Sequence, residues 1–186
     1  MRPGRSNQVR IIAGRFRRRL LHFPDVPGLR PTPDRTRETL FNWLGQDLTG
    51  LSCLDAFAGS GALGFEAASR GAGRVVLWER DAKALAALRG NALELGIPGV
   101  EVMAADALSS LRATGESFDV IFLDPPFSEG LLEPALAAAA TRLRPGGRIY
   151  AESPMPLPAE LLQGFGLTAV RQGKAGLSHY CLLERM

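Results

Sequence analysis

The sequence predicts an α/β fold in which a largely parallel β-sheet carries helices on both faces. From residue 51 onward, short apolar runs typical of strands alternate with segments whose apolar residues recur at helical spacing. The first apolar run ends in a glycine-rich turn that leads into one of the helical segments. Because parallel strands need a crossover connection, usually a helix, this alternation favours a parallel sheet. At 186 residues the chain can bury one core, so we expect a single domain over residues 1–186.

The apolar pattern predicts the order of the elements. The strand-like runs are 51–57, 74–79, 100–104, 118–124, 147–152, 166–171 and 177–184. The helix-like segments between the first five runs are 62–70, 82–95, 107–113 and 131–143. Only a short turn around Gln172, Gly173 and Lys174 is expected between the last two runs, which predicts an antiparallel hairpin at a sheet edge.

A basic segment precedes this alternation. Residues 1–40 contain ten arginines and three acidic residues, whereas the rest of the chain is slightly acidic. Arginines at 17–19 separate the apolar stretches 9–13 and 20–23, which favours a folded ribbon over a solvated tail. Since guanidinium groups match phosphate geometry, we predict that residues 1–29 bind an anionic partner and that residues 30–186 form a helix and the catalytic core. The candidate contact residues are Arg10, Arg15, Arg17, Arg18 and Arg19.

Residues 30–34, Arg-Pro-Thr-Pro-Asp, predict the start of a helix before the first strand. Thr32 suits the N-cap, and Pro33 suits the first helical position. The acidic side chains of Asp34 and Glu38 favour the positive end of that helix. The apolar residues between 40 and 44 predict one buried face that ends near Gly45.

Several classes of protein conflict with the composition. The chain has no run of eighteen apolar residues, and its basic beginning lacks the apolar stretch of a secretory leader. Cys53 and Cys181 stand in apolar runs without metal-ligand spacing, so we expect buried, reduced thiols in a cytoplasmic protein that holds no metal. His22 and His179 have no cysteine or acidic partner at ligand or triad spacing. We also expect a monomer.

A ligand-binding turn is predicted over residues 55–64, Asp-Ala-Phe-Ala-Gly-Ser-Gly-Ala-Leu-Gly. Its glycines allow a tight turn and close approach of a ligand, and the following helix start offers unpaired N–H groups. Glu79 ends the next strand, where its carboxylate can accept both hydroxyls of a ribose. Glycines at 59, 61 and 64 with an acidic residue about twenty positions on also fit the dinucleotide fingerprint.

Two cofactors fit this turn. A dinucleotide would place its pyrophosphate on the helix start, whereas S-adenosylmethionine has no phosphate and needs an acceptor for its ammonium, which Asp55 supplies. Asp106 follows the third strand and can bind the adenine amino group, cap the next helix, or do both. The candidate cofactor-binding residues are Asp55, Phe57, Gly59, Ser60, Gly61, Glu79 and Asp106.

The motif Asp124-Pro125-Pro126-Phe127 follows the fourth strand and favours S-adenosylmethionine. Two consecutive prolines fix the backbone, and the Asp124 carboxylate and Pro125 carbonyl can accept the two hydrogens of an amino group. Phe127 offers a flat face to a nucleobase. Holding both N–H bonds aims the nitrogen lone pair at the methyl carbon, so orientation would provide most of the rate. These four residues are the candidate catalytic residues.

The same residues argue against several other functions and leave some open. A nicotinamide-dependent oxidoreductase would give the Asp-Pro-Pro-Phe motif no role and would lack a substrate domain. A cytosine-C5 methyltransferase needs a cysteine nucleophile after the fourth strand, and neither cysteine is there. An RNA-binding module without catalysis would have no need of the intact motif. Methylation of adenine N6 or of a protein side chain stays open, because each presents an amino group to the same acceptors.

In their order along the chain, residues 55–61, Glu79 and residues 124–127 resemble the class I methyltransferases that act on amino groups. Residues 9–14 (VRIIAG) and 30–44 (RPTPDRTRETLFNWL) further resemble the bacterial 16S ribosomal RNA guanine-N2 methyltransferase family, and the likeness covers nearly the whole chain. The family's basic hairpin commonly contains Arg-Gly-Arg, where this chain has Arg15-Phe16-Arg17-Arg18-Arg19. The charge is kept, so the departure affects the geometry of RNA docking only.

The resemblance has specific implications. It implies S-adenosylmethionine as cofactor and a seven-stranded sheet of order 3-2-1-4-5-7-6 beside an N-terminal β-ribbon and helix. It implies a guanine of 16S rRNA, in the small ribosomal subunit or its assembly intermediate, as the methylated base, and that rRNA as the partner of the five arginines. It also implies that Arg30 to Thr32 lie over the methionine end of the cofactor, which makes Thr32 a candidate cofactor-binding residue.

Overall fold

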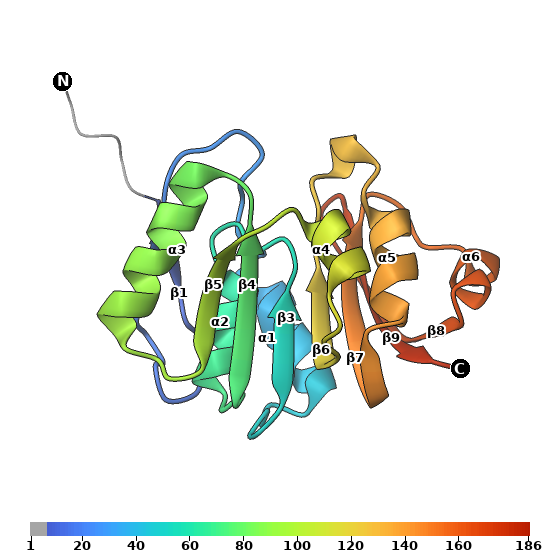
Figure 1. Ribbon diagram of the computed structural model, residues 1–186, viewed down its shortest axis with the longest axis horizontal. Coiled ribbons are helices and arrows are strands. Elements are labelled where there is room, and N and C mark those ends of the chain that lie inside the picture. The colour runs from blue at the N-terminus through green and yellow to red at the C-terminus, as the bar shows by residue number, and fades with distance from the viewer. Residues whose placement is uncertain (1–6) are drawn as a thin grey trace.

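The computed structural model describes residues 7–186, so Arg2 and Arg5 of the basic segment lie outside the described residues. A seven-stranded sheet with helices on both faces forms the body of the molecule, which confirms the predicted α/β class (Figure 1). The strand order is β5-β4-β3-β6-β7-β9-β8, which is the order 3-2-1-4-5-7-6 when the strands are counted from β3. Strands β3 to β7 run parallel, and β9 is antiparallel to both β7 and β8.

The elements follow the predicted alternation with ends that shift by up to four residues, and residues 159–164 form a helix that the pattern did not predict. The strands of the sheet are β3 (Ser52–Asp55), β4 (Arg74–Glu79), β5 (Val100–Ala104), β6 (Phe118–Leu123), β7 (Leu143–Ser153), β8 (Leu167–Ala175) and β9 (Ser178–Arg185). The helices are α1 (Asp34–Leu44), α2 (Ala62–Ser69), α3 (Ala82–Leu95), α4 (Ala107–Ala113), α5 (Leu132–Ala140), α6 (Ala159–Gly164) and the 3-10 helix η1 (Phe127–Glu129).

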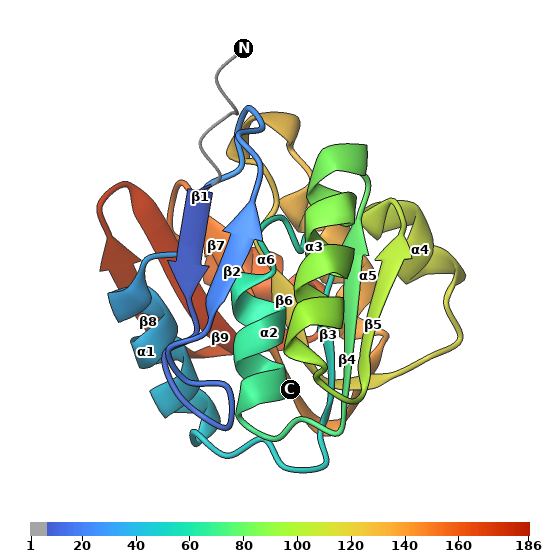
Figure 2. The same ribbon diagram turned by 90° about the vertical axis from the view of Figure 1, so that its left-hand side faces the viewer.

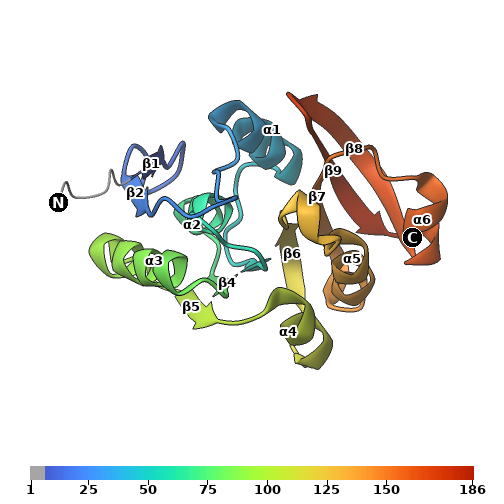
Figure 3. The ribbon, with the colours of Figure 1, turned by 90° about the horizontal axis from the view of Figure 1, so that it is seen from above.

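Two hydrophobic cores lie on opposite faces of the sheet. Helices α1, α2 and α3 cover one face, and α4, α5 and α6 cover the other (Figure 3). Because side chains alternate along a strand, Val120 and Phe122 of β6 enter the first core while Ile121 and Leu123 enter the second. Among residues 7–186, no helix is long and apolar enough to cross a membrane.

The predicted N-terminal ribbon is present as the antiparallel pair β1 (Asn7–Arg10) and β2 (Leu20–Phe23). It lies beside α2 and α3 (Figure 2), and the Asn91 side chain of α3 exchanges hydrogen bonds of 3.0 and 2.8 Å with the His22 backbone. Ile11 and Leu21 are fully buried in the same core as the sheet. The ribbon is therefore part of the packed body.

The predicted turn between the last two strands is misplaced. Gln172, Gly173 and Lys174 are paired within β8, opposite residues 179–181 of β9. The chain turns instead at Gly176, whose φ of +58° suits glycine. Gly173 has another reason to lack a side chain, because a Cβ there would lie 2.5 Å from the Tyr180 ring. The glycine at position 173 therefore indicates the space that the Tyr180 ring needs and not a turn.

Candidate active site

Carboxylates gather where the parallel strands β3, β6 and β7 end side by side. Asp55 ends β3, Asp124 follows β6, and Glu152 lies one residue before the end of β7. Asp55 and Glu152 are buried, and Asp124 is half-buried. This edge of the sheet is where α/β folds commonly bind ligands.

The glycine-rich turn between β3 and α2 is held by two of the predicted acidic residues. Gly61, with a φ of +79°, forms the N-cap of α2, and a Cβ there would lie 2.6 Å from Leu88 and Phe65. Asp55 accepts a hydrogen bond of 3.0 Å from the Gly64 N–H. Glu79 accepts one of 2.9 Å from the Gly59 N–H and one of 2.7 Å from the Asp81 N–H. Each carboxylate keeps acceptor capacity for a ligand, because its oxygens provide about four lone-pair sites.

The other predicted cofactor residues lie along the same edge. Phe57 is partly buried, and the buried Ser60 hydroxyl accepts from the Ala62 N–H at 3.3 Å. Asp106 caps α4 by accepting from the Ser109 N–H at 2.9 Å, and its side chain is exposed after β5. The capping role predicted for Asp106 is thus present, and an adenine contact beside it stays a prediction. Among residues 7–186, no cluster of His, Cys, Asp and Glu side chains has an arrangement that could hold a metal ion.

The Asp-Pro-Pro-Phe motif leaves the sheet directly after β6. Pro125 is buried, whereas Pro126 and Phe127 are exposed, Phe127 by 44%. An exposed ring beside a half-buried carboxylate leaves one aromatic face available to a flat ligand. The segment is tied to the loop after β4 by the ion pair of Glu129 with Arg80, whose nitrogen lies 2.6 Å from both carboxylate oxygens.

The predicted N-cap role of Thr32 is wrong. Helix α1 begins at Asp34 with Pro33 as its N-cap, and no side chain caps it. The buried Thr32 hydroxyl instead lies 3.1 Å from Glu152 Oε1 and 3.4 Å from Asp124 Oδ2. The Arg37 guanidinium holds this segment by donating to the Thr32 carbonyl at 3.1 Å. Thr32 therefore contacts two carboxylates that lie 92 and 120 positions later in the sequence.

Glu152 was not among the predicted site residues. Its oxygens accept hydrogen bonds from Tyr150 at 2.7 Å and Ser178 at 3.0 Å as well as from Thr32. The available signal was its position, because the apolar run of β7 ends on an acidic residue as β3 and β4 do. Burial and the neighbouring charges of Glu152 and Asp55 raise the pKa of Asp124 well above its usual range, against the opposing effect of Thr32.

The predicted arginine contacts lie away from these carboxylates. Arg15, Arg17, Arg18 and Arg19 are exposed in the turn between β1 and β2. The Arg15 N–H donates to the carbonyl of Ser69, the last residue of α2, at 2.7 Å. Since α2 begins at the glycine turn and rises about 1.5 Å per residue, this basic turn is about 12 Å along the helix from the cluster. A groove of about 490 Å³ lined partly by Arg17 lies beside it.

Arg10 is placed differently from the other four. It ends β1, its side chain is exposed, and its guanidinium lies 3.8 Å from Asp34 at the start of α1. Its carbonyl accepts from Arg37 at 3.0 Å. Arg10 thus lies between the basic turn and the carboxylate cluster, because α1 starts immediately after the Thr32 segment.

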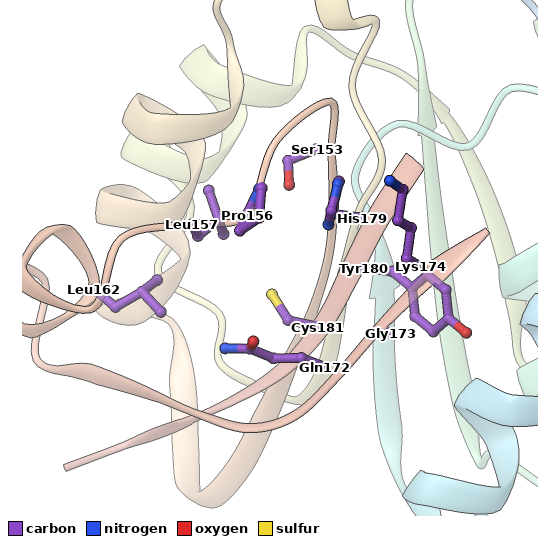
Figure 4. Close-up of a pocket in the computed structure, with 10 residues that line it drawn as sticks. All are labelled: Ser153, Pro156, Leu157, Leu162, Gln172, Gly173, Lys174, His179, Tyr180 and Cys181. Atoms are coloured by element: carbon purple, nitrogen blue, oxygen red, sulfur yellow. The ribbon is translucent and has the colours of Figure 1, made fainter. Parts of the chain in front are cut away.

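A separate cavity of about 280 Å³ lies between the end of β7, α6 and the β8–β9 hairpin (Figure 4). Its apolar side includes Leu157, Leu162 and Cys181, and its polar side includes Lys174 and His179. It contains none of the predicted site residues. Cys53 and Cys181 are both buried and free, as predicted. Burial raises the pKa of each thiol to about 12, so both are unreactive at neutral pH.

If Asp55 binds the ammonium of the cofactor, cofactor affinity should increase with pH. Burial, opposed by the hydrogen bond from Gly64, raises the Asp55 pKa from 3.8 to about 7. Below that pH the carboxyl carries a proton and cannot form an ion pair, so Kd should fall by up to about tenfold per unit as the pH rises toward the Asp55 pKa. Calorimetric titration with S-adenosylmethionine checks this. The variant Asp55→Asn should lose the dependence, and a constant wild-type Kd would exclude the ion pair.

A family model described as "Conserved hypothetical protein 95" matches residues 9–184. Ribosomal RNA small subunit methyltransferase D of Escherichia coli K12 is 49% identical over 128 residues, which cover 69% of this chain and 65% of that protein. The chain thus matches slightly less than two thirds of that relative's length. The protein of the same name from Haemophilus influenzae is 39% identical over 188 residues, covering 98% of this chain and 96% of that protein.

A solved structure extends these comparisons to the fold. The 16S rRNA N2 G1207 methyltransferase of Thermus thermophilus, in complex with AdoMet and guanosine, has a TM-score of 0.76 and 25% identity. The likeness covers 98% of this chain and 50% of that one. The predicted class I methyltransferase fold is thereby confirmed.

Proposed function

The chain belongs to the family described as conserved hypothetical protein 95, and on this premise we propose that it transfers a methyl group from S-adenosylmethionine to the N2 amino group of a guanine in 16S rRNA. Relatives that share 39 to 49% of their residues with it are named small-subunit rRNA methyltransferases. The choice of guanine N2 is supported by the Thermus protein, which is named for that position and is bound to guanosine.

The acceptor pair at the end of β6 is the observation that carries the proposal. Asp124 and Pro125 follow β6, and the glycine turn follows the neighbouring strand β3, so an amino group bound to the two acceptors would be beside a cofactor held by that turn. The two acceptors take its two hydrogens and direct the nitrogen lone pair toward the turn. Phe127 supports the base from one side. When bound, S-adenosylmethionine supplies an electrophilic methyl group on a positively charged sulfur.

The residues around the turn fit this cofactor. Buried Asp55 has a raised pKa and no ion-pair partner among the described residues, so a ligand ammonium would stabilise its charged form. Glu79 has acceptor capacity for ribose hydroxyls. The proposed reaction needs neither a phosphate-binding loop nor a hydride acceptor, which a nicotinamide-dependent reaction would need.

Binding of the cofactor separates the methyltransferase from the nicotinamide-dependent alternative. Calorimetric titration should give a saturable signal with S-adenosylmethionine and with its demethylated product, and none with NADH. Binding of NADH with no response to S-adenosylmethionine would exclude the proposed reaction.

Reversing the charge of the basic turn should weaken RNA binding but not cofactor binding. We expect Arg17→Glu combined with Arg18→Glu to raise the Kd for 16S rRNA by about tenfold or more at low salt, because phosphate contacts provide much of such affinity. The cofactor Kd should change less than twofold. Filter binding and calorimetry measure the two constants.

The matched control for that double variant is Arg171→Glu combined with Arg185→Glu, which reverses two exposed arginines of the β8–β9 pair at the opposite end of the sheet from the ribbon (Figure 1). It should leave RNA affinity unchanged. Deleting the ribbon would be a poor test, because Val9, Ile11, Leu21 and Phe23 would leave the core. Equal effects of the two charge reversals would mean that the basic turn is no RNA contact.

The partner assigned by this proposal is the rRNA of the small ribosomal subunit or of its assembly intermediate. The RNA would extend from the acceptors at Asp124 past Arg10 to the basic turn, a path set by the lengths of α1 and α2. A cytoplasmic location follows from such a substrate and remains, with the monomeric state, a prediction.

A further inference from the structure

We propose that Glu152 is a positioning residue for methyl transfer, which acts on Asp124 through the hydroxyl of Thr32. The inference rests on the proposed function and deepens it, because it assigns a residue that determines how Asp124 holds the substrate amine and where the released proton goes.

The surroundings of Glu152 distinguish it from an ordinary surface carboxylate. It is 6% exposed and accepts hydrogen bonds from three hydroxyls in separate positions, those of Thr32, Tyr150 and Ser178. Within residues 7–186, no ion pair involves it. Hydroxyl donors stabilise a buried carboxylate without cancelling its charge, so the charge still acts on neighbouring groups.

The Thr32 hydroxyl connects the two carboxylates. Its oxygen lies 3.1 Å from Glu152 and 3.4 Å from Asp124, but a hydroxyl has only one hydrogen. When that hydrogen points to Glu152, the Thr32 oxygen can accept a hydrogen bond from a protonated Asp124. When Asp124 is ionised, the hydroxyl can rotate and donate to it. The link therefore orients the Asp124 carboxyl group in both of its protonation states.

The charge of Glu152 also favours proton uptake by Asp124. The titratable groups that face Asp124 are Asp55 from β3 and Glu152 and Tyr150 from β7. During transfer the nitrogen–carbon bond forms as the sulfur–carbon bond breaks, and the methylated nitrogen must lose one proton. Asp124 can take this proton and release it to water, and a neighbouring negative charge strengthens it as an acceptor.

The test replaces Glu152 by glutamine, which keeps its shape and removes its charge. Methyl transfer to undermethylated small-subunit rRNA is measured between about pH 5.5 and 9. We expect Glu152→Gln to lower kcat by about tenfold to 100-fold and to move the rising limb of the pH profile downward, because Asp124 then ionises at lower pH. The KM for S-adenosylmethionine should change less than threefold.

Two further variants separate positioning from simple structural support. Glu152→Asp keeps the charge and should leave the rising limb of the profile where the wild type has it, even if kcat falls. Thr32→Val removes the linking hydroxyl at nearly constant shape and should lower kcat measured at saturating S-adenosylmethionine. Thr32→Val is also the deciding variant if Glu152→Gln does not fold.

An unchanged pH profile in folded Glu152→Gln, or wild-type kcat in Thr32→Val, would show that Glu152 does not act on Asp124. Failure of the proposed function would appear differently, as a wild-type enzyme that transfers no methyl group to rRNA at any pH.

Discussion

Replacing Asp124 by alanine is expected to abolish methyl transfer, with a loss of at least about 1,000-fold in kcat, while cofactor affinity stays within a few-fold. The substitution removes one of the two acceptors for the amine, so the nitrogen lone pair is no longer held toward the methyl carbon. It also removes the group that takes up the released proton. Asp124 is not among the residues that hold the glycine turn, so cofactor binding should persist.

Single-turnover transfer from labelled S-adenosylmethionine measures this loss, and calorimetry measures cofactor binding in the same preparation. Glu133→Ala, which removes an exposed carboxylate in the first turn of α5, is the matched control and should be as active as the wild type. Activity of Asp124→Ala close to that of Glu133→Ala would exclude Asp124 from the reaction.

Replacing Glu66 by alanine should destabilise the protein by about 3–5 kcal/mol. Glu66 is fully buried in α2 and accepts hydrogen bonds from the N–H groups of Ile12 and Ala13 at 2.8 and 3.0 Å. The same carboxylate binds Arg37 of α1 at 3.3 Å and Arg70 at 3.0 Å. Its removal would leave the fully buried Arg37 guanidinium with one carboxylate partner fewer, and the Ile12 and Ala13 N–H groups without partners. The ribbon, α1 and α2 would therefore lose a contact that all three share.

Urea denaturation followed by circular dichroism measures the free energy of unfolding of this variant. Glu94→Ala, at an exposed position of α3, is the control and should stay within about 0.5 kcal/mol of the wild type. A loss below about 1 kcal/mol for Glu66→Ala would mean that water can replace the carboxylate, and that the apolar residues of the ribbon and its other hydrogen bonds are enough to attach it.

Local pattern was enough to predict the strands of the sheet and, except for Glu152, the acidic residues at their ends. Each of these patterns determines the conformation of only a few residues: the apolar run before Asp55, the glycines after it and the prolines after Asp124. The elements β3, α2 and β6 formed close to where those patterns predicted. The order of the seven strands came from a family resemblance, because spacing along the chain does not state which strands become neighbours.

Contacts between segments that lie far apart in the chain could not be predicted from the sequence. Thr32 had a local explanation as a helix cap, and only the family resemblance put it near the cofactor. Neither predicted that its hydroxyl would lie 3.1 Å from Glu152. Glu66 lies within an apolar helical segment and gave no sign that it binds the ribbon. Arg10 and the arginines at 15–19 were predicted as one contact set, but the docking of the turn on Ser69 shows that the arginines at 15–19 lie a helix length from the carboxylates.

Methyl transfer from labelled S-adenosylmethionine to undermethylated small ribosomal subunits, followed by nucleoside analysis of the rRNA, shows directly whether the protein methylates guanine N2. We predict that the label appears in N2-methylguanosine and is absent when Asp124→Ala replaces the wild-type protein. Label in another methylated base would keep the chemistry of the acceptor pair but contradict guanine as the substrate. No label from a protein that binds the cofactor would contradict rRNA as the substrate.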